Sequence, residues 1–166
     1  MKKLAVALSV FSLLALGASP ALARGGGWQP LGLPGARAVR NCPGTTDVLH
    51  IVFTTGKEYY RVVTQHGVDY LQVTGAFKFD ATNQQTGQTR HYNSSGPTHV
   101  PIELANIDFV ATGLNSLFFS TEQVEQWGLP VAFITSGPID ISFGPNGEIT
   151  AVQITNIKDD ICAELT

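Results

Sequence analysis

The apolar and polar residues of this chain alternate with a period of two through most of its length after residue 47. In the clearest run, at 70–79, polar residues occupy one face and four apolar residues the other: Leu71, Val73, Phe77 and Phe79. A period of two is typical of a β-strand with one buried face. The pattern therefore predicts an all-β domain in which each strand packs one face against a core.

The strongest local signal is a hairpin within 137–162. An alternating run at 139–143 leads into Gly144-Pro145-Asn146-Gly147, and a second alternating run begins at Ile149. Asn and Gly tolerate the positive φ angles of a tight turn, so an Asn-Gly pair between two such runs is typical of a hairpin. We predict that this hairpin closes the domain and that its second strand leads directly to Cys162.

Other strands are predicted wherever alternation recurs between turn residues. The runs are 47–53, 58–65, 70–79, 88–93, 100–104, 109–112, 117–120 and 131–143, the last with a bend at 136–138. Turns are predicted at 55–57, 66–67 and 83–87, and one short helix at 120–128, where Ser120 and Gln123 have capping-box spacing. Gly75 lies on an apolar face, which indicates a bulge, a bend or a close backbone approach. The sum is an antiparallel β-barrel or β-sandwich of about eight to ten strands, between which the pattern does not decide.

The start of the chain has the layout of a secretory signal peptide. Lys2 and Lys3 precede an apolar run at 4–16, and Ala21-Leu22-Ala23 fits the small-x-small cleavage pattern. We expect residues 1–23 to be removed, leaving a flexible Gly/Pro-rich leader at 24–44 and a single all-β domain at 45–166. The mature chain has no apolar run long enough for a transmembrane segment, so a secreted or extracytoplasmic location is predicted.

Charge narrows the choice of partners. Removing residues 1–23 takes away two lysines and no acids, which leaves eight basic and 13 acidic residues and a net charge of −5. Binding to nucleic acid and to anionic membranes is driven by Lys and Arg. The sequence therefore predicts no nucleic-acid partner.

The cysteine count predicts one cross-link. Only Cys42 and Cys162 remain after export, and in an oxidising compartment such a pair forms a disulfide. The bond would tie both ends of the domain together, and in the chain-entropy model so long a loop is worth about 4 to 5 kcal/mol. A metal-binding or catalytic thiol is not expected, because no CxxC spacing occurs and no histidine lies nearby in sequence.

A set of short motifs carries a resemblance. They are Thr86-Gly87-Gln88-Thr89, Ser95-Gly96-Pro97, Gly137-Pro138, the Asn146-Gly147 turn and the segment Asp160-Ile161-Cys162-Ala163-Glu164-Leu165. In these motifs the chain resembles small exported proteins common in actinomycete-type bacteria. The resemblance covers residues 42–165 and implies a β fold and a disulfide. It implies no catalytic residue.

Four histidines remain after export: His50, His66, His91 and His99. His66 and Asp69 flank a predicted turn, but two ligands do not make a metal site, and we predict neither metal nor cofactor. His91 and His99 flank Ser94 and Ser95, which raises the possibility of a hydrolase. No G-x-S-x-G elbow is present, and turn chemistry explains the two serines.

Aromatic residues are the better candidates for a binding function. Tyr59 and Tyr60 are adjacent, so one of them must face away from whatever the other packs on. Exposed aromatics on a sheet can bind sugar rings or a protein partner, and the alternative is that they belong to a second apolar layer. The predicted ligand-binding residues are Tyr59, Tyr60, Tyr70, Tyr92 and His50.

Three hypotheses for function follow. The first is a secreted, non-enzymatic β-domain that binds a small ligand, an envelope component or a protein partner, since no catalytic signature occurs. The second is a small secreted hydrolase or isomerase with its site in a barrel mouth, based on the four histidines and the scattered acids. The third is a secreted inhibitor that presents a rigid loop at 84–87 or 115–117.

Overall fold

The structure, a computed structural model of the 166-residue chain, describes residues 27–30, 37–103 and 108–166. The predicted signal peptide, 1–23, lies outside these residues. The described residues form 12 strands and two short helices: β1 (Gln29–Pro30), β2 (Arg37–Asn41), β3 (Val48–Gln65), β4 (Val68–Asn83), β5 (Thr89–Ser95), β6 (Thr98–Pro101), β7 (Asp108–Ala111), β8 (Leu114–Phe118), α1 (Thr121–Trp127), β9 (Ala132–Ser136), β10 (Ile139–Phe143), β11 (Ile149–Ile154), β12 (Ile157–Asp160) and α2 (Ile161–Leu165). The prediction of an all-β fold is confirmed.

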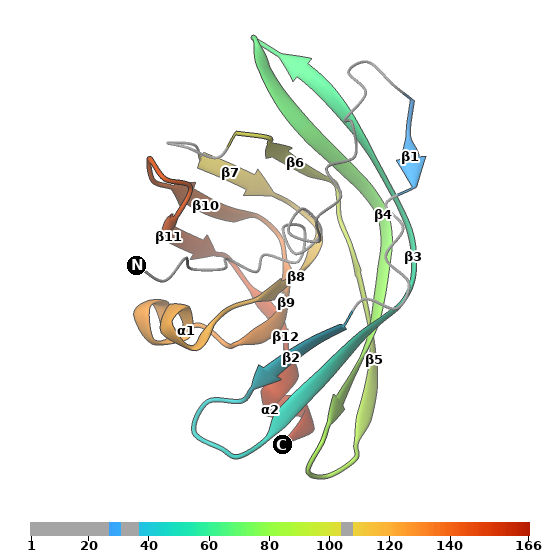
Figure 1. Cartoon of the computed structure of the whole chain (residues 1–166), viewed down its shortest axis with the longest axis vertical. Coiled ribbons are helices and arrows are strands. Elements are labelled where there is room, and N and C mark those ends of the chain that lie inside the picture. The colour runs from blue at the N-terminus through green and yellow to red at the C-terminus, as the bar shows by residue number, and fades with distance from the viewer. Residues whose placement is uncertain (1–26, 31–36, 104–107) are drawn as a thin grey trace.

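All strand pairs are antiparallel, and the strands form two sheets (Figure 1). The larger sheet has nine strands in the order β1-β3-β4-β6-β7-β10-β11, with β2 also paired to β3 and β5 to β4. The smaller sheet has three strands in the order β12-β9-β8. Among the described strands, no pairing connects β11 back to β1 or β2.

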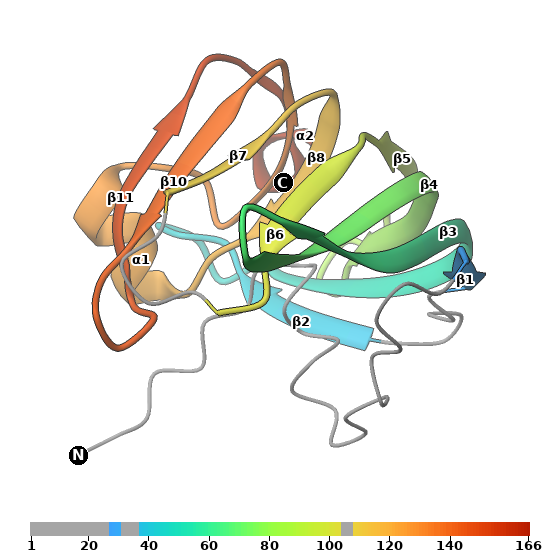
Figure 2. The ribbon, with the colours of Figure 1, turned by 90° about the horizontal axis from the view of Figure 1, so that it is seen from above.

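Three neighbouring segments pass from one sheet into the other. β7 continues into β8 through residues 112–113, β9 into β10 through 137–138, and β11 into β12 through 155–156. The backbone N–H of Gly137 donates to the carbonyl of Gly113 at 3.1 Å, which holds two of these corners together. The predicted bend at 136–138 is confirmed, and it is the point where the chain changes sheet. Figure 2 shows β7, β10 and β11 on one side of the molecule and β3 and β4 on the other.

The described residues form more strands than the sequence predicted, for two reasons. The segment predicted as a flexible leader, 24–44, contributes β1 and β2, and both pair with β3. The hairpin strand predicted to run from Ile149 to Cys162 divides into β11 and β12, so the expectation that it delivers Cys162 directly is wrong. Cys162 lies in α2, where Asp160 caps the helix by accepting the N–H of Ala163 at 3.1 Å.

A continuous antiparallel pair, β3 and β4, forms the longest element of the fold. No turn occurs at 55–57, where one was predicted, and β3 runs straight through. The register shifts between Phe53 and Thr55, so one extra residue enters β3 at a β-bulge. The buried face is therefore carried by odd-numbered residues before the bulge and by even-numbered residues after it. That change of phase, together with Gly56, produced the false turn signal.

Close packing at Gly75 confirms the prediction made for that residue. Gly75 pairs with Glu58, has a φ of 122°, and a Cβ built on it would lie 2.0 Å from the carbonyl oxygen of Lys57. We call residues 48–53 with 77–83 the closed half of the β3–β4 pair, and residues 58–65 with 68–75 the open half. Gly75 and Glu58 lie where the two halves meet.

Buried side chains form two core clusters. The first core cluster packs the closed half against the smaller sheet and α2, and includes the rings of Phe53, Phe79 and Phe118. The second core cluster packs the open half against β7, β10 and α1, and includes Phe133 and Ile141. The smaller sheet is buried on both faces, because alternate residues of β8 and β9 belong to different clusters.

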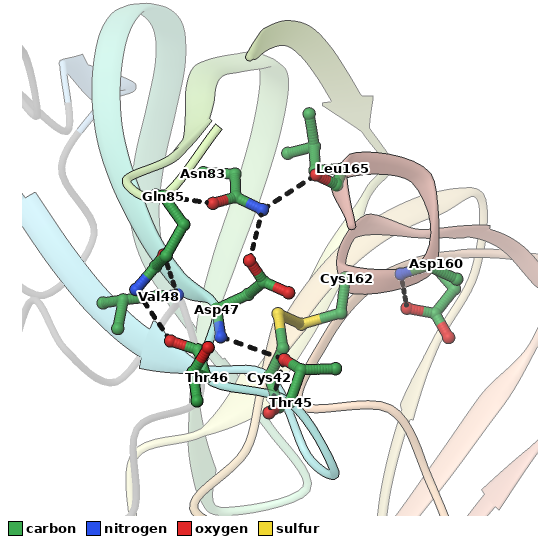
Figure 3. Close-up of a disulfide and its surroundings, with 11 residues drawn as sticks. Cys42, Thr45, Thr46, Asp47, Val48, Asn83, Gln85, Asp160, Cys162 and Leu165 are labelled. Carbon is green, nitrogen blue, oxygen red and sulfur yellow. Dashed lines mark hydrogen bonds between the residues drawn. A yellow bond between two sulfur atoms is a disulfide. The ribbon is translucent and has the colours of Figure 1, made fainter. Parts of the chain in front are cut away.

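A single disulfide joins Cys42 to Cys162, as predicted, with 5.7 Å between the Cα atoms (Figure 3). Beside it, the side-chain amide of the fully buried Asn83 donates to Asp47 Oδ1 at 3.0 Å and to the carbonyl of Leu165 at 2.8 Å. The loop before β3, the end of β4 and α2 are therefore tied together at one end of the domain. This arrangement covers the closed half.

The predictions of a short helix, of three turns and of the hairpin are confirmed. α1 is capped by Ser120 and Gln123, whose side chains each accept the other's backbone N–H, and it ends at Gly128 in the left-handed conformation. Tight turns occur at 66–67, 83–87 and 144–147. The hairpin at 139–154 forms with Ile141 opposite Val152.

Candidate functional site

Two exposed aromatic side chains lie on the outer face of the open half. Tyr59 is 42% exposed and Trp28 is 44% exposed. β1 pairs with β3 so that Gln29 lies opposite Tyr60, which brings Trp28 beside Arg61. Because side chains alternate along a strand, Tyr59 and Arg61 share the face opposite to Tyr60.

Arg61 contacts two other residues on this face. Its Nε donates to Oε1 of Gln72 at 2.6 Å, and its guanidinium carbon lies 4.6 Å from the centroid of the Trp28 ring. Gln72 is buried and pairs with His99 of β6. Trp28, which directly precedes β1, therefore forms a row with Arg61 of β3, Gln72 of β4 and His99 of β6.

We call this face the outer platform, made of Trp28, Tyr59, Arg61, Tyr70, Gln72 and His99. Tyr70 is half-buried and follows the same face, because it pairs with Val63 and lies two residues before Gln72. No carboxylate pairs with Arg61 among the described residues. The platform thus combines aromatic surface with a cation, an amide and an imidazole that can hydrogen-bond a ligand.

The inner face of the same strand carries Glu58 and Tyr60. Tyr60 packs against the second core cluster, and its hydroxyl donates to Oε1 of Gln29 at 3.0 Å. Glu58 is half-buried, and desolvation by that burial raises the pKa of its carboxyl to about 7. The two adjacent tyrosines therefore face opposite ways, as the alternation required.

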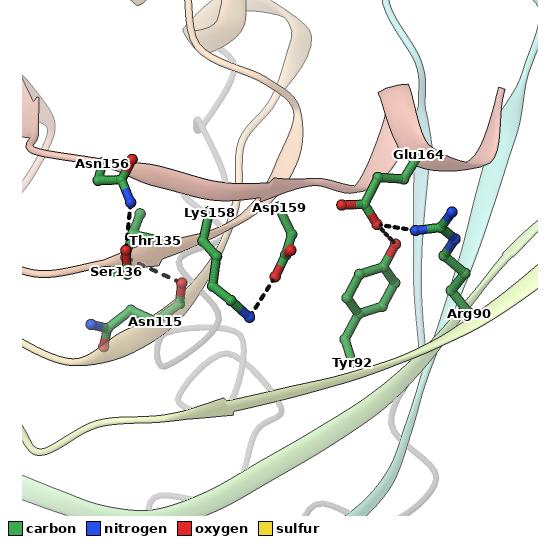
Figure 4. Close-up of polar contacts among 9 residues, drawn as sticks. All are labelled: Arg90, Tyr92, Asn115, Thr135, Ser136, Asn156, Lys158, Asp159 and Glu164. Carbon is green, nitrogen blue, oxygen red and sulfur yellow. Dashed lines mark hydrogen bonds and ion pairs between the residues drawn. The ribbon is translucent and has the colours of Figure 1, made fainter.

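Tyr92 is buried, and its contacts stabilise the fold. It is buried in the first core cluster, stacks on Phe79 with 5.2 Å between ring centroids, and donates its hydroxyl to Glu164 Oε2 at 2.9 Å. Burial, and then the bond to Glu164, raise the pKa of Tyr92. Arg90 reaches the same carboxylate oxygen at 2.8 Å (Figure 4). Tyr92 therefore anchors α2 to β5 and does not belong to the outer platform.

The histidines and the serine considered for a hydrolase differ in their surroundings. His91 Nδ1 lies 2.6 Å from Asp80 Oδ1, but its side chain is 81% exposed on an open strand surface. Ser94 is buried and donates to the hydroxyl of Ser116 at 3.2 Å. His50 is half-buried, pairs with Thr82 in the closed half and lies outside the outer platform. Among the described residues, no group of three or more His, Cys, Asp or Glu could hold a metal ion.

A pocket of about 450 Å³ lies beside the disulfide, between the loop after Cys42, the end of α1 and α2. Its volume is in the range of ligand sites, and its lining is mainly apolar. Two of the polar side chains that line it are already engaged, since Asp160 caps α2 and the hydroxyl of Thr45 accepts the N–H of Asp47 at 3.0 Å. Few groups remain to orient a ligand, so the outer platform is the stronger candidate.

The chain matches no family model, no curated protein and no solved structure in the comparisons made with each. In the part of the chain that the structure describes, neither helix has the length and apolar character needed to cross a membrane. The candidate site therefore depends on the chemistry of the residues themselves.

Sequence reasoning placed Tyr59 and Tyr70 among the candidates and missed Trp28, Arg61 and Glu58. Trp28 stands in a Gly/Pro-rich segment with no period, so nothing in the sequence placed it beside a strand. Arg61 lies on the same face of its strand as Tyr59, and the alternation makes this the polar face. Glu58 is in phase with Tyr60 and Val62, and an acid in an apolar phase is the signal that could have found it.

Proposed function

We propose that the protein is an exported, non-enzymatic β-domain that binds carbohydrate on the outer platform. The observation that carries this proposal is the stacked pair of Trp28 and Arg61, which holds an aromatic ring in place on an open sheet face. A sugar ring presents C–H groups that pack on indole or phenol faces, and hydroxyl groups that bond to polar side chains. Tyr59 supplies a second exposed ring, and Gln72 and His99 supply polar groups.

Arg61 refines the ligand class. A guanidinium binds carboxylates with charge-assisted, two-point geometry, and this guanidinium has no acidic partner among the described residues. We therefore favour acidic sugars such as uronates over neutral ones. The predicted export of the chain would place it where such polymers occur, and the disulfide between Cys42 and Cys162 is compatible with that location.

The architecture that we propose for this domain is an incomplete barrel. The three segments that pass between the sheets curve around the two core clusters, as a barrel wall does. β2 and β12 are not paired among the described residues, and the disulfide joins Cys42, directly after β2, to Cys162 of α2, directly after β12. The outer platform then lies on the outside of the wall.

Affinity electrophoresis tests the proposal, with glucan, mannan, xylan, alginate and pectate each cast in a native gel. We expect alginate or pectate to retard the protein, and Trp28→Ala to weaken that retardation at least about tenfold, because stacked aromatics dominate such surfaces. Val110→Ala is the matched control, since Val110 is 52% exposed on β7, away from the platform. Absence of retardation by every polymer, or equal retardation of Trp28→Ala, contradicts the proposal.

Fluorescence gives an independent readout. The chain has two tryptophans, and Trp127 packs on Phe119 with 5.5 Å between ring centroids. In Trp127→Phe the emission comes from Trp28 alone, so binding of an oligouronate should change its intensity and wavelength. An unchanged spectrum at saturating oligouronate contradicts binding at the platform.

A further inference from the structure

The pocket beside the disulfide, with a volume of about 450 Å³, is formed by segments that lie far apart in the sequence. The loop after Cys42 lines one side, the end of α1 with residues 128–131 lines another, and α2 lines a third. Cys42 and Cys162 both contribute to the lining, so the disulfide ties two of these sides together (Figure 3). Of the described residues that line the pocket, none belongs to β3 or β4, so the pocket is separate from the outer platform.

Apolar side chains make up most of the lining, and several of them still have surface in contact with water. Val124, Leu129 and Pro130 are half-buried, and Ala163 is exposed. A ligand can remove this surface from water, and burial of apolar surface contributes about 25 cal/mol per Å². The pocket therefore favours a ligand with an apolar body.

The polar side chains of the pocket favour a ligand that donates hydrogen bonds. Asp160 is the one lining residue with a charged side chain among those that the structure describes. Its Oδ1 accepts the N–H of Ala163 at 3.1 Å, and no described residue forms a hydrogen bond or ion pair with Oδ2. Thr45 donates its hydroxyl hydrogen to the carbonyl of Cys42 at 3.3 Å, which leaves its oxygen as an acceptor only.

We propose that this pocket binds a small organic cation, with a protonated amine at Asp160 and an apolar body against Val124, Leu129 and Pro130. A protonated amine has three donors and no acceptor, so it suits a carboxylate oxygen that has no other partner. A neutral alcohol forms only an uncharged donor's hydrogen bond there, and a second carboxylate is repelled. The site does not depend on carbohydrate binding at the outer platform.

Asp160 has two roles that one substitution can separate. Its Oδ1 caps α2, and its Oδ2 is the proposed contact of the amine. Asn caps helices about as well as Asp, so Asp160→Asn keeps the cap and removes the charge. The variant should therefore fold like the wild type and lose the preference for a cation.

Calorimetry with three probes that share a phenylethyl body tests this site: 2-phenylethylamine, 2-phenylethanol and 3-phenylpropanoate, at pH 7 with the oxidised protein. We expect the amine to bind at least about threefold more tightly than the alcohol, because a charge-assisted hydrogen bond to a half-exposed carboxyl contributes more than a neutral one. 3-Phenylpropanoate should bind most weakly. Asp160→Asn should remove the difference between amine and alcohol. Glu125→Gln, at an exposed carboxyl of α1 outside the lining, should keep it.

A second measurement locates the amine without any substitution. In the wild type, the methyl NMR signals of Leu129 and Ala163 should shift as 2-phenylethylamine is added, because both side chains line the pocket. Val110, exposed on β7, supplies the control signal. The proposal is overturned by equal binding of amine and alcohol, by a difference that persists in Asp160→Asn, or by shifts no larger at Leu129 than at Val110. Asp160→Asn should still be retarded by the polymer that retards the wild type, because Asp160 lies outside the outer platform.

Discussion

The two halves of the β3–β4 pair are built from the same strands and stabilised in different ways. In the closed half, Leu49, Ile51, Phe79 and Ala81 are fully buried, and β2, β5, α2 and the disulfide lie around them. In the open half the strand ends project past the rest of the sheet (Figure 1), and the inner face holds a half-buried acid. Cross-links and complete burial belong to one half, and the candidate binding groups to the other.

We infer from this difference that the closed half stabilises the fold and the open half binds the ligand. Two charged groups of the open half, Arg61 and Glu58, lack an oppositely charged partner among the described residues, which costs stability that the rest of the fold must supply. The closed half does so through the disulfide and the Asn83 contacts. Changes in the closed half should therefore reduce stability strongly and leave binding intact, and changes in the open half should do the reverse.

Removal of the disulfide should have the largest effect on stability. Cys42 and Cys162 are separated by 120 residues, so replacing both by Ser should lower the free energy of unfolding by about 4 to 5 kcal/mol in the chain-entropy model. Urea denaturation of the oxidised wild type and the double variant measures the loss. Added reductant should destabilise the wild type alone. A double variant with an unchanged melting temperature would show that the closed half does not depend on its cross-link.

Gly75→Ala should have the next largest effect, because it acts where the two halves meet. The new Cβ would lie 2.0 Å from a backbone oxygen in a conformation that L-residues avoid, and we expect a loss of about 3 kcal/mol in the free energy of unfolding. Gly87→Ala is the matched control, since Gly87 also has a positive φ, 72°, but faces open space. Its cost should be about 1 kcal/mol. Equal losses in the two variants would mean that the close approach at Gly75 is unimportant.

Much of the closed half could be predicted from the sequence, because its signals are local. The turn at 83–87 and the pairing of two lone cysteines each follow from a few residues. In the open half the strands at 58–65 and 70–79 and the turn at 66–67 could also be predicted, but the bulge after Phe53 shifts the alternation by one position and hides that β3 is continuous. The sequence therefore predicted a strand that begins at Glu58, and an acidic residue at the first position of a strand does not indicate a functional role. Trp28 was missed because Arg61, which packs on its ring, lies more than thirty positions away in the sequence.

Asn83→Ala tests the closed half at a single side chain. Its amide joins Asp47 and Leu165, and its carbonyl oxygen accepts the backbone N–H of Gln85 at 2.8 Å. Loss of these buried hydrogen bonds should lower the free energy of unfolding by about 2 kcal/mol. Asn93→Ala, at an exposed position of β5, is the control and should change little. If carbohydrate retardation weakened in Asn83→Ala while the fold persisted, the separation of the halves would be wrong.

The smallest expected effect is also the one that identifies the open half by its pH dependence. The pKa of Glu58 is raised from 4.5 to about 7 in the folded protein, so between these values the unfolded chain ionises and the folded chain does not. Folding of the wild type therefore loses stability as pH rises through this window, and Glu58→Gln, which has no charge to bury, does not. The variant should match the wild type near pH 4 and become more stable above pH 7, by on the order of 1 kcal/mol given the partial exposure of the carboxyl. Urea denaturation at pH 4, 6 and 8 measures the difference, and Glu125→Gln should show none. A difference that stayed constant with pH would place Glu58 in water and remove both the unpaired acid and the contrast between the halves.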